Sequence, residues 1–428
     1  MAVDWPPQPL GKLVQNFDSR RVPLSSRERE KRRGRFPYHG ATGVMDYIDD
    51  FLFEGLHLLV GEDGSVETTD GNPFLQLVDG RFWVNNHAHV LKGKTDVETW
   101  FIYYALSTVA IRPFMSGSVQ AKLSQGNLNR IPISYPPQES TRLAITHILG
   151  TLDDKIGLNR RMNATLEAMA RALFQSWFVD FDPVRAKLDG RKPIGLDETT
   201  AALFPASFQE STVGHIPNGW TVGKVSDLAT LNRGAVNPGD FPAETFDHFS
   251  LPAFDNGRTP KVDLGSSIMS NKFTVTPNSV LLSKLNPHIP RIWLPDLHAA
   301  RRSVCSTEFM VACSKPGVSR EYLFSLFTSS AFASIYGTLV TGTTGSHQRI
   351  RPESVLDMKI VIPSPPLIRA FTDIAKPMFD RINRNTEQSR TLATLRDTLL
   401  PKLLSGELSV AATVAKSATV QTGKETRP

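Results

Sequence analysis

The amino-acid sequence carries one long pattern twice. The first copy contains the run Gly117 to Gln120, then Tyr135-Pro136-Pro137, then a long helix pattern. The second copy contains the run Gly345 to Gln348, then Ser364-Pro365-Pro366, then another long helix pattern. The nearly constant spacing between the copies indicates one duplicated unit with small insertions or deletions. A duplicated unit predicts a pseudo-symmetric molecule, and such molecules suit two-part targets, of which a DNA site made of two half-sites is the best known.

Length and composition describe an ordinary globular chain. Its 428 residues allow two or three domains, each large enough for its own core. The net charge of +6 favours a polyanionic partner without proving one. Two cysteines, Cys305 and Cys313, exclude a disulfide framework and a four-cysteine zinc site. No secretory signal pattern opens the chain, and the most apolar stretch, Phe51 to Val60, is too short to span a membrane. We therefore expect a cytoplasmic protein without membrane contact.

Two segments have the composition of mixed globular domains. Residues 1–138 contain strand-like runs such as Phe82-Trp83-Val84, followed by a helix with an apolar face from Trp100 to Val109. Residues 216–366 repeat this order and end with a helix from Tyr322 to Tyr336 and a proline-containing strand. Each segment therefore predicts an α+β domain that precedes a long helix.

Segments 139–182 and 367–406 each predict one long helix. Apolar residues recur alternately three and four positions apart in both, which is typical of a coiled-coil seam, although a core-facing stripe on an ordinary helix would look similar. Asn159 and Asn385 occupy the same position near the middle of each seam. Antiparallel packing would let their amides meet, whereas the alternative is that each faces solvent or a flanking protein. Pro377 should kink the second helix or mark its start. The predicted seam positions are Ile145, Ile148, Leu152, Lys155, Asn159, Met162, Leu166, Met169, Leu173 and Ser176 in the first helix, and Phe371, Ile374, Met378, Arg381, Asn385, Gln388, Leu392, Leu395, Leu399 and Lys402 in the second.

Two other segments lack such periodicity. Residues 183–215 are rich in Pro, Gly, Asp and Thr and are expected to link the first helix to the second globular segment. Residues 407–428 lack aromatic residues and apolar periodicity, which predicts a disordered tail.

Basic and polar side chains gather in both globular segments. A run of eight cations lies between Arg20 and Arg35. It fits a solvated loop and phosphate contact equally well. Elsewhere arginine or lysine stands beside asparagine or glutamine, a combination suited to guanine and adenine edges. The candidate nucleic-acid-binding residues are Gln120, Lys122, Lys284, Asn286, Arg301, Arg302, Gln348, Arg349 and Arg351.

Sequence signatures of enzymes are incomplete. No Gly-x-x-x-x-Gly-Lys-Ser/Thr loop is present, so no nucleotide site of that type is expected. Asn72-Pro73-Phe74 lacks the second proline of an amino-methyltransferase tetrapeptide, and Asp153-Asp154-Lys155 resembles part of a nuclease motif but falls in the helix pattern. His87 and His89 supply only half of a metal site and are better interpreted as a packed or hydrogen-bonded pair. We therefore predict no catalytic and no metal-binding residues.

Several runs, taken in their order, resemble one protein family. They are Gly40 to Gly64, Val84 to Val90, Leu173 to Asp182, Pro217 to Trp220, and Leu399 to Gly406, together with the Gly-Ser-x-Gln turns and both Pro-Pro junctions. In this order the chain is similar to the specificity subunits of type I restriction–modification enzymes. The resemblance covers residues 1 to about 410, and no single motif decides it.

The resemblance implies an α+β fold in which two pseudo-repeated target-recognition domains, residues 1–138 and 216–366, are separated by two long antiparallel helices that form a coiled coil. It implies recognition of a bipartite asymmetric site in double-stranded DNA, with two methyltransferase subunits and restriction or motor subunits as partners. It also implies that the chain has no catalytic activity and binds no cofactor, while S-adenosylmethionine, ATP and Mg belong to the partner subunits. The alternatives are a stand-alone DNA methyltransferase or nuclease, and a coiled-coil scaffold that does not read bases.

Overall fold

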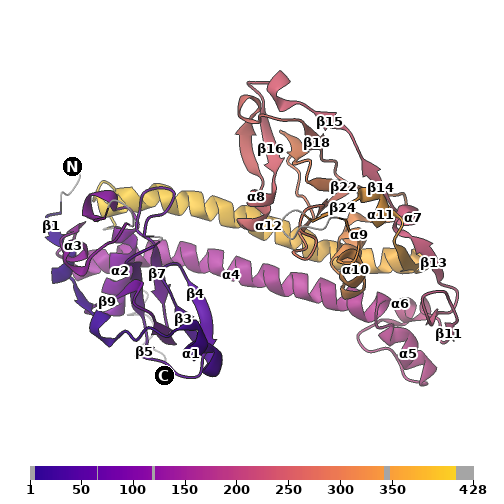
Figure 1. Ribbon diagram of the computed structural model, residues 1–428, viewed down its shortest axis with the longest axis horizontal. Helices are drawn as coiled ribbons and strands as arrows, with labels where there is room; N and C mark the ends of the chain where they lie inside the picture. The colour runs from indigo at the N-terminus through magenta and orange to yellow at the C-terminus, as the bar shows by residue number, and fades with distance from the viewer. Residues whose placement is uncertain (1–4, 65, 118–120, 342–347, 411–428) are drawn as a thin grey trace, which may run out of the picture. The chain divides into compact units, whose positions relative to one another are not determined.

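The chain forms two compact units, which can be followed by label and colour in Figure 1. The computed structural model describes residues 5–64, 66–117, 121–341 and 348–410. The first unit contains residues 1–158 and 388–428, and the second contains residues 159–387. Each unit therefore combines one globular segment with parts of both long helices. Within the described ranges, no helix has the length and apolar character that crossing a membrane requires.

The first unit contains two four-stranded sheets, in the orders β2-β9-β6-β7 and β4-β3-β8-β5, and a small β1-β10 pair. All pairs are antiparallel except β3 with β8. Its elements, with η for 3-10 helices, are β1 (Pro7–Pro9), η1 (Leu10–Lys12), β2 (Val14–Asn16), η2 (Asp18–Arg20), α1 (Ser26–Lys31), β3 (Arg33–His39), β4 (Val44–Ile48), β5 (Phe53–Glu54), β6 (His57–Gly61), β7 (Leu75–Val78), β8 (Arg81–Val84), β9 (Ala88–Gly93), α2 (Asp96–Leu106), η3 (Arg112–Phe114), α3 (Gln125–Asn129) and β10 (Pro132–Ser134).

The sheet that contains β6 is the middle layer of this unit. Successive strand residues point to opposite faces, so Leu58 packs with Phe101 of α2 on one face while Leu59 packs with Phe53 and Phe82 of the other sheet. This is why every residue of β6 is buried and why its sequence lacks the polar alternation of a half-exposed strand. Helix α2 begins where the side chain of Thr95 accepts the N–H of Glu98.

The second unit has sheets in the orders β14-β22-β19-β20 and β15-β18-β21-β16-β17, with a β13-β25 pair. Its elements are α5 (Asp182–Leu188), α6 (Glu198–Ala202), β11 (Phe208–Gln209), β12 (Ile216–Pro217), β13 (Thr221–Lys224), α7 (Val225–Leu228), β14 (Ala229–Asn232), β15 (Ala235–Val236), η4 (Pro238–Asp240), β16 (Thr245–Phe249), α8 (Leu251–Asp255), β17 (Lys261–Leu264), η5 (Gly265–Ser267), β18 (Lys272–Thr274), β19 (Ser279–Ser283), β20 (Ile292–Trp293), β21 (Arg302–Cys305), β22 (Phe309–Ser314), α9 (Arg320–Phe327), α10 (Ser330–Tyr336), β23 (Val340–Thr341), β24 (Arg349–Ile350), α11 (Pro352–Leu356) and β25 (Lys359–Ile362).

Strand order confirms the duplication that the sequence predicts. Strands β2, β9, β6 and β7 correspond to β14, β22, β19 and β20, and the parallel pair β3·β8 corresponds to β16·β21. The layers correspond as well, because Leu282 faces the α9 side of its sheet while Leu281 faces Phe249. Both units are thus α+β and share one topology. This likeness makes a residue-by-residue comparison of the two units possible.

Helices α4 (Glu139–Phe178) and α12 (Pro365–Leu404) pack antiparallel to one another. In the first unit Asp153 of α4 accepts a 2.6 Å ion pair from Arg396 of α12. In the second unit Asn163 of α4 lies 3.4 Å from the carbonyl of Ile382 of α12. Increasing residue numbers on one helix therefore meet decreasing numbers on the other, as predicted. Helix α12 also runs through Pro377, so this proline does not mark the start of the helix.

The two seam asparagines meet in a buried polar cluster of the second unit. The side-chain amide of Asn159 donates to the backbone carbonyl of Asn385 over 3.3 Å. The amide of Asn385 donates in turn to the side-chain oxygen of Asn163 over 2.9 Å. Asn159 is fully buried and Asn385 nearly so, which confirms a contact between them. Asn163, which the seam pattern does not include, completes the cluster.

Several predicted seam positions are wrong. Met169 is exposed, whereas its neighbour Ala170 is buried. Ile374 and Leu395 are exposed, as are Arg381, Gln388 and Lys402. An unstrained helix has 3.6 residues per turn, so a strict 3.5-residue pattern moves off the buried face over several turns. The buried stripe therefore shifts to Phe174 and Trp177 near the end of α4, rather than continuing through Leu173 and Ser176.

The aromatic end of α4 packs within the second unit. Phe174, Trp177 and Phe178 are buried against Trp220 and Phe371, among others. These three rings therefore complete the core of the second unit and are not exposed to a partner. The linker also contains structure, since α5, α6 and β11 lie between residues 182 and 209. Val410 is buried in the first unit's core, and residues 411–428 lie outside the described part of the chain.

Replacing Asn163 with alanine should lower the free energy of unfolding by about 1–2 kcal/mol, because the substitution removes an acceptor for the amide of Asn385 in a buried setting. Urea denaturation followed by circular dichroism measures this. Arg160→Ala, an exposed position on the same helix, is the control and should change stability by less than about 0.5 kcal/mol. Equal effects of the two substitutions would contradict a structural role for the cluster.

Candidate nucleic-acid interface

Two segments of the second unit bring the candidate residues Lys284, Asn286, Gln348 and Arg349 together. Leu285 and Arg349 form an isolated antiparallel bridge. On either side of it the N–H of Asn286 donates to the carbonyl of Gln348 over 2.9 Å, and the N–H of Ile350 donates to the carbonyl of Lys284 over 3.0 Å. These contacts confirm none of the residues as a DNA ligand, but they place side chains more than 60 positions apart in the sequence at one edge of the unit.

The cations of this edge are partly neutralised. The guanidinium of Arg349 lies 2.7 Å from the carboxylate of Glu308, and that of Arg233 lies 2.6 Å from Glu353. Lys284 is half-buried beneath them, with its ammonium 5.6 Å from the centre of the Phe273 ring. Burial lowers the pKa of Lys284 below its ordinary value. Because Arg349 and Arg233 are well exposed, each keeps part of its donor surface toward solvent.

A groove of about 250 Å³ runs beside these side chains. We call the exposed cationic edge formed by Arg233, Lys284, Arg349 and Arg351 the second-unit basic site. Arg351 is exposed and precedes helix α11. Arg233 does not stand out in the sequence, because it follows a strand without another cation nearby; only the fold reveals its position. The groove is lined by Leu231, Asn232, Arg233, Phe273, Lys284, Phe309, Met310, Val311, Pro352 and Glu353.

Asn286 adopts a left-handed backbone conformation, with φ of 50°. Asparagine tolerates this region better than most residues do, and the topologically equivalent residue of the first unit is Gly64, with φ of 77°. The turn is therefore a shared feature of the duplicated fold. In the second unit it also places Asn286 beside Gln348 and Arg349, with the side-chain oxygen of Asn286 buried.

Arg301 and Arg302 lie apart from the second-unit basic site. Arg301 donates over 2.8 Å to Asp247, which is fully buried on β16. Arg302 pairs with Glu244 at 3.1 Å and stacks on Phe241, with 4.2 Å from its guanidinium carbon to the ring centre. Both line a separate cavity of about 640 Å³. The sequence analysis places Arg301 and Arg302 in one set of candidates with Lys284 and Arg349. In the structure the two pairs of residues lie on separate surfaces.

In the first unit, the candidate Gln120 lies outside the described residues, and Lys122 is exposed. Lys122 pairs with Glu62 at 3.2 Å. Half of the basic run holds the unit together: Arg20 donates to the carbonyl of Leu52, and Arg21, Arg29 and Arg32 pair with Glu62, Asp46 and Asp49. This explains why the run cannot be interpreted as a free cationic loop. Four further cations of the run are exposed, namely Arg27, Lys31, Arg33 and Arg35.

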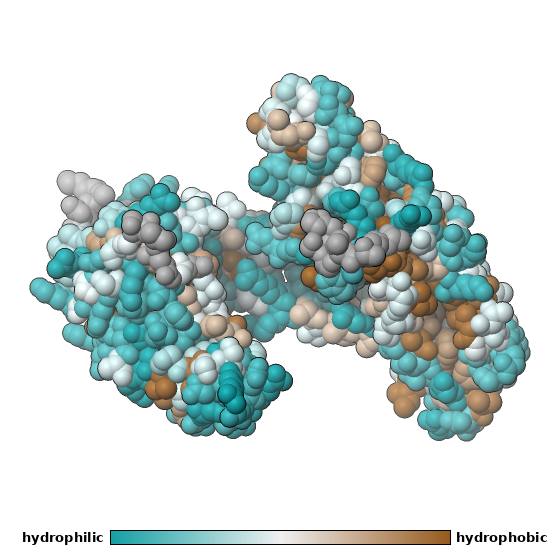
Figure 2. Space-filling view, in the orientation of Figure 1, coloured by the Kyte–Doolittle hydropathy of each residue, from teal (hydrophilic) through white to brown (hydrophobic). Residues whose placement is uncertain are grey.

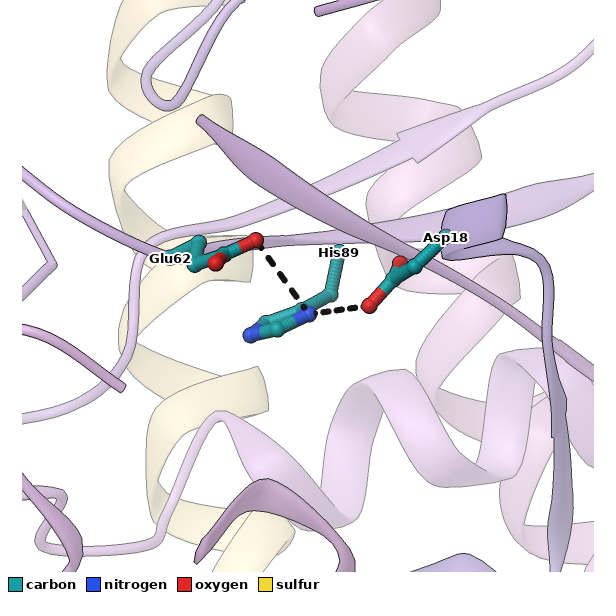
Figure 3. Close-up of side chains that lie close together, drawn as sticks. All are labelled: Asp18, Glu62 and His89. Carbon is teal, nitrogen blue, oxygen red and sulfur yellow. Dashed lines mark hydrogen bonds and ion pairs between the residues drawn. The ribbon is translucent and has the colours of Figure 1, made fainter. Parts of the chain in front are cut away.

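Lys122 borders a compact ionic cluster through its ion pair with Glu62, and Figure 3 draws the members Asp18, Glu62 and His89. The ring of His89 lies between the carboxylates of Asp18 and Glu62, with Nδ1 2.6 Å from the first and 3.7 Å from the second. Among the described residues, these three form the group of possible metal ligands, because their carboxylate and imidazole atoms lie within 4.8 Å of one another. The guanidinium of Arg21 lies 2.6 Å from Glu62, so a cation of the chain itself already occupies the space beside these carboxylates. We therefore assign no metal site here.

The same positions of the two units carry different charges. The backbone hydrogen bonds of Glu62 to His87 and Leu123 recur at Lys284, which bonds Glu308 and Ile350. Counting along the paired strands then matches Asp18 with Arg233, Glu62 with Lys284, His89 with Met310, and Lys122 with Arg349. The acidic and histidine-containing cluster of the first unit thus corresponds to the basic site of the second.

Two motifs with a remote likeness to catalytic sequences serve the fold. Asn72 closes a turn with Thr68: its carbonyl accepts the backbone N–H of Thr68, and its own N–H donates to the hydroxyl of Thr68. Asp153 accepts hydrogen bonds from Tyr104 and Arg396 on the inner side of α4. Burial and the bond to Asp153 hold the pKa of Tyr104 far above its ordinary value. Neither group is arranged as a catalytic pair.

Comparison with known proteins places these observations in a family. Residues 3–168 match the family described as the type I restriction modification DNA specificity domain. A Haemophilus influenzae protein described as a type I restriction enzyme specificity subunit is 36% identical over 150 residues, which are 35% of this chain and 37% of that relative. The type I restriction enzyme MjaIX specificity subunit of Methanocaldococcus jannaschii is 24% identical over 338 residues, covering 74% of this chain and 71% of the relative.

A solved structure shows the same fold. The type I restriction-modification system S subunit from M. genitalium superposes with a TM-score of 0.56 at 13% identity, covering 94% of this chain and 96% of the other. The chain is thus similar to the specificity subunits of type I restriction–modification enzymes, and residues 3–168 match the DNA specificity domain of that family. The relatives that it matches are described as specificity subunits.

Asn286 permits a test that separates backbone from side chain. Asn286→Ala should cost about 1–2 kcal/mol of stability relative to Asn286→Gly, because alanine is strained at a φ of 50° and glycine is not. Thermal or urea unfolding of both variants measures the difference. Both variants lose the amide, so equal loss of DNA affinity would assign that loss to the side chain. Equal stability of the two variants would contradict the left-handed turn.

Proposed function

We propose that the second-unit basic site contacts the DNA target. Arginine suits bidentate recognition of guanine or phosphate, and the neighbouring amides of Asn286 and Gln348 suit adenine edges. Arg349 and Arg233 pair with carboxylates at the rim, which tunes their orientation but leaves them exposed. The observation that carries the proposal is the convergence of Lys284 and Asn286 from one segment with the exposed Arg349 from another.

We further propose that each domain reads one half of a bipartite asymmetric site, with residues 1–138 and 216–366 as the recognition domains. Residues 139–182 and 367–406 are then the spacers between them. In the first domain Lys122 and Gln120 make the contact that Arg349 makes in the second. Arg301 and Arg302 belong to a separate cationic surface and contact phosphates. The opposite charges at matched positions support this proposal, because an asymmetric site requires two different readers.

The partners in this proposal are two methyltransferase subunits and the restriction or motor subunits, which carry S-adenosylmethionine, ATP and Mg in the cytoplasm. A groove of about 240 Å³ in the second unit offers an apolar surface to such a partner. Its lining includes the half-exposed side chains of Val213 and Ile335, and Figure 2 shows hydrophobic residues gathered beside α10. Figure 2 shows that the visible surface over the strands of the first unit is mainly hydrophilic, which suits nucleic-acid contact.

Replacing Arg349 and Arg351 with alanine should weaken DNA binding without unfolding the chain. Each lost phosphate contact should lower the slope of log affinity against log salt by about 1, while a lost guanine contact should cost about 1–3 kcal/mol at the matching base pair. Fluorescence titration of the reconstituted complex at several salt concentrations measures both. Lys192→Ala, an exposed linker lysine, is the control. Unchanged affinity of the double variant would refute the assignment.

The isolated chain should bind neither S-adenosylmethionine nor ATP. Isothermal titration calorimetry of the purified chain, with the reconstituted complex as the positive control, tests this directly. Binding of either compound to the isolated chain would favour the alternative of a stand-alone enzyme. Competition between random duplexes and the site found by mapping methylated adenines with and without the gene would separate recognition from a scaffold role.

A further inference from the structure

Two arginines of the second-unit basic site have carboxylate partners at the surface. Nη2 of Arg349 donates to Glu308 over 2.7 Å, and Nη2 of Arg233 donates to Glu353 over 2.6 Å. The side chains of these arginines are nevertheless 57% and 71% exposed. Ion pairs this exposed add little to stability, because water screens the charges and two long side chains must be ordered. Stability alone therefore does not account for the pairing at this edge.

The first unit pairs the corresponding cation by a different route. There Lys122 pairs with Glu62 at 3.2 Å. The N–H of Glu62 donates to the carbonyl of His87, and the N–H of Lys284 donates to the carbonyl of Glu308, so the two carboxylates stand at positions that do not match. Inheritance of one ancestral ion pair does not explain this arrangement. The pairing of a surface cation with a carboxylate is itself what the two edges have in common.

A paired arginine binds a phosphate less readily than an unpaired one. Sequence-independent binding depends on cations that neutralise phosphates and release counter-ions. The charge of Arg233 is already balanced by Glu353. A phosphate that approaches this arginine also meets the like charge of the carboxylate, which lies 2.6 Å from Nη2. Such an arginine therefore contributes little to the binding of random DNA.

A guanine edge does not meet this opposition. Its O6 and N7 accept hydrogen bonds and carry no net charge. Within the described residues Arg233 contacts Glu353 through Nη2 alone, and a guanidinium has five N–H donors, so it can bind a base while the carboxylate stays in place. Pairing also orders the long side chain beforehand, which lowers the entropy lost on binding. The carboxylate therefore favours a base contact over a phosphate contact.

Arg351 differs from both paired arginines. It is exposed, it immediately precedes α11, and it forms no ion pair with any residue that the structure describes. Its charge is therefore available to a phosphate. The second-unit basic site thus contains two kinds of arginine, although Arg349 and Arg351 stand only two positions apart in the sequence.

We propose that Glu308 and Glu353 are positioning residues that direct their arginines to neutral base edges, guanine above all, and away from phosphates. Arg351 contacts a phosphate. The two carboxylates then lower the affinity for random DNA and leave recognition of the target intact, so they raise specificity rather than affinity. This inference rests on the proposed function, because the basic site must contact DNA for its carboxylates to matter.

The test replaces each carboxylate with an uncharged side chain of the same shape, Glu308→Gln and Glu353→Gln, in the reconstituted complex. Fluorescence titration at several salt concentrations compares the target, located by mapping methylated adenines, with a random duplex of equal length. In the double variant the affinity for the random duplex should rise about tenfold, and its slope of log affinity against log salt should steepen by about 1–2. Affinity for the target should change by less than about threefold, so the ratio of the two affinities falls.

Asp357→Asn is the matched control. Asp357 follows the last residue of α11 and pairs with Lys224 at 2.9 Å, outside the basic site. Its replacement removes the same charge as Glu353→Gln, so an effect of net charge alone would raise the affinity for random DNA equally in both variants. Equal effects would overturn the proposal. Target and random affinities that fall together in the glutamine variants would overturn it as well, because a structural role predicts that outcome.

Two further variants show whether Glu353 acts through Arg233. In the Arg233→Ala background, Glu353→Gln should no longer change the ratio of target to random affinity, because the side chain that the carboxylate directs is absent. Glu353→Asp keeps the charge and should retain most of the preference for the target. An undiminished effect of Glu353→Gln in the absence of Arg233 would contradict the positioning role.

Single alanine variants separate this inference from the proposed function. Arg351→Ala should weaken binding of both duplexes alike and reduce the salt slope by about 1, whereas Arg233→Ala should weaken binding of the target about tenfold more than that of the random duplex. If neither variant changes DNA affinity, the proposed function fails and this inference fails with it. If both variants weaken binding but the glutamine variants leave the ratio unchanged, the DNA contact stands and the role of the carboxylates is refuted.

Discussion

The antiparallel packing of α4 on α12 is the contact on which both units depend. Because the helices run in opposite directions, the end of α12 enters the core of the first unit through Leu400 and Leu403, and the end of α4 enters the core of the second through Phe174 and Trp177. Removal of such an aromatic side chain from a core costs about 3–5 kcal/mol. Neither core can therefore be completed by one continuous stretch of chain, and the buried asparagines of the second unit fix which turns of the helices meet.

The two copies of the duplicated unit keep the same backbone hydrogen bonds, while their side chains differ in charge. The hydrogen bonds that hold Glu62 are made by its backbone, and Lys284 makes the same bonds with a side chain of opposite charge. Backbone hydrogen bonds do not depend on the charge of the side chain. The charge of Glu62 is balanced by its ion pairs with Arg21 and Lys122. One fold can in this way present an ionic cluster with a buried histidine in one unit and a cationic edge in the other.

Sequence reasoning recovered part of the candidate site. Lys284, Asn286 and Arg349 do come together, because they end or begin strands that the duplicated fold pairs. Arg233 was missed, since an isolated cation after a strand has no signature in the sequence. Arg29 and Arg32 pair with Asp46 and Asp49, which lie 17 residues away in the sequence, and only the β3–β4 pairing brings these partners near.

The sequence by itself determined the duplication, the α+β class, the two long helices, and the resemblance to the family, because each of these follows from local periodicity or from the order of short motifs. Only the tertiary structure decided which side chains are buried and which charges are paired. The burial of Ala170 in place of Met169 depends on how a 3.6-residue helix meets its neighbour. The pairing of His89 with Asp18 joins residues 71 positions apart, and the other ring nitrogen of His89 faces a carbonyl on a third segment. Such contacts are properties of the folded chain, because no periodicity in the sequence connects their members.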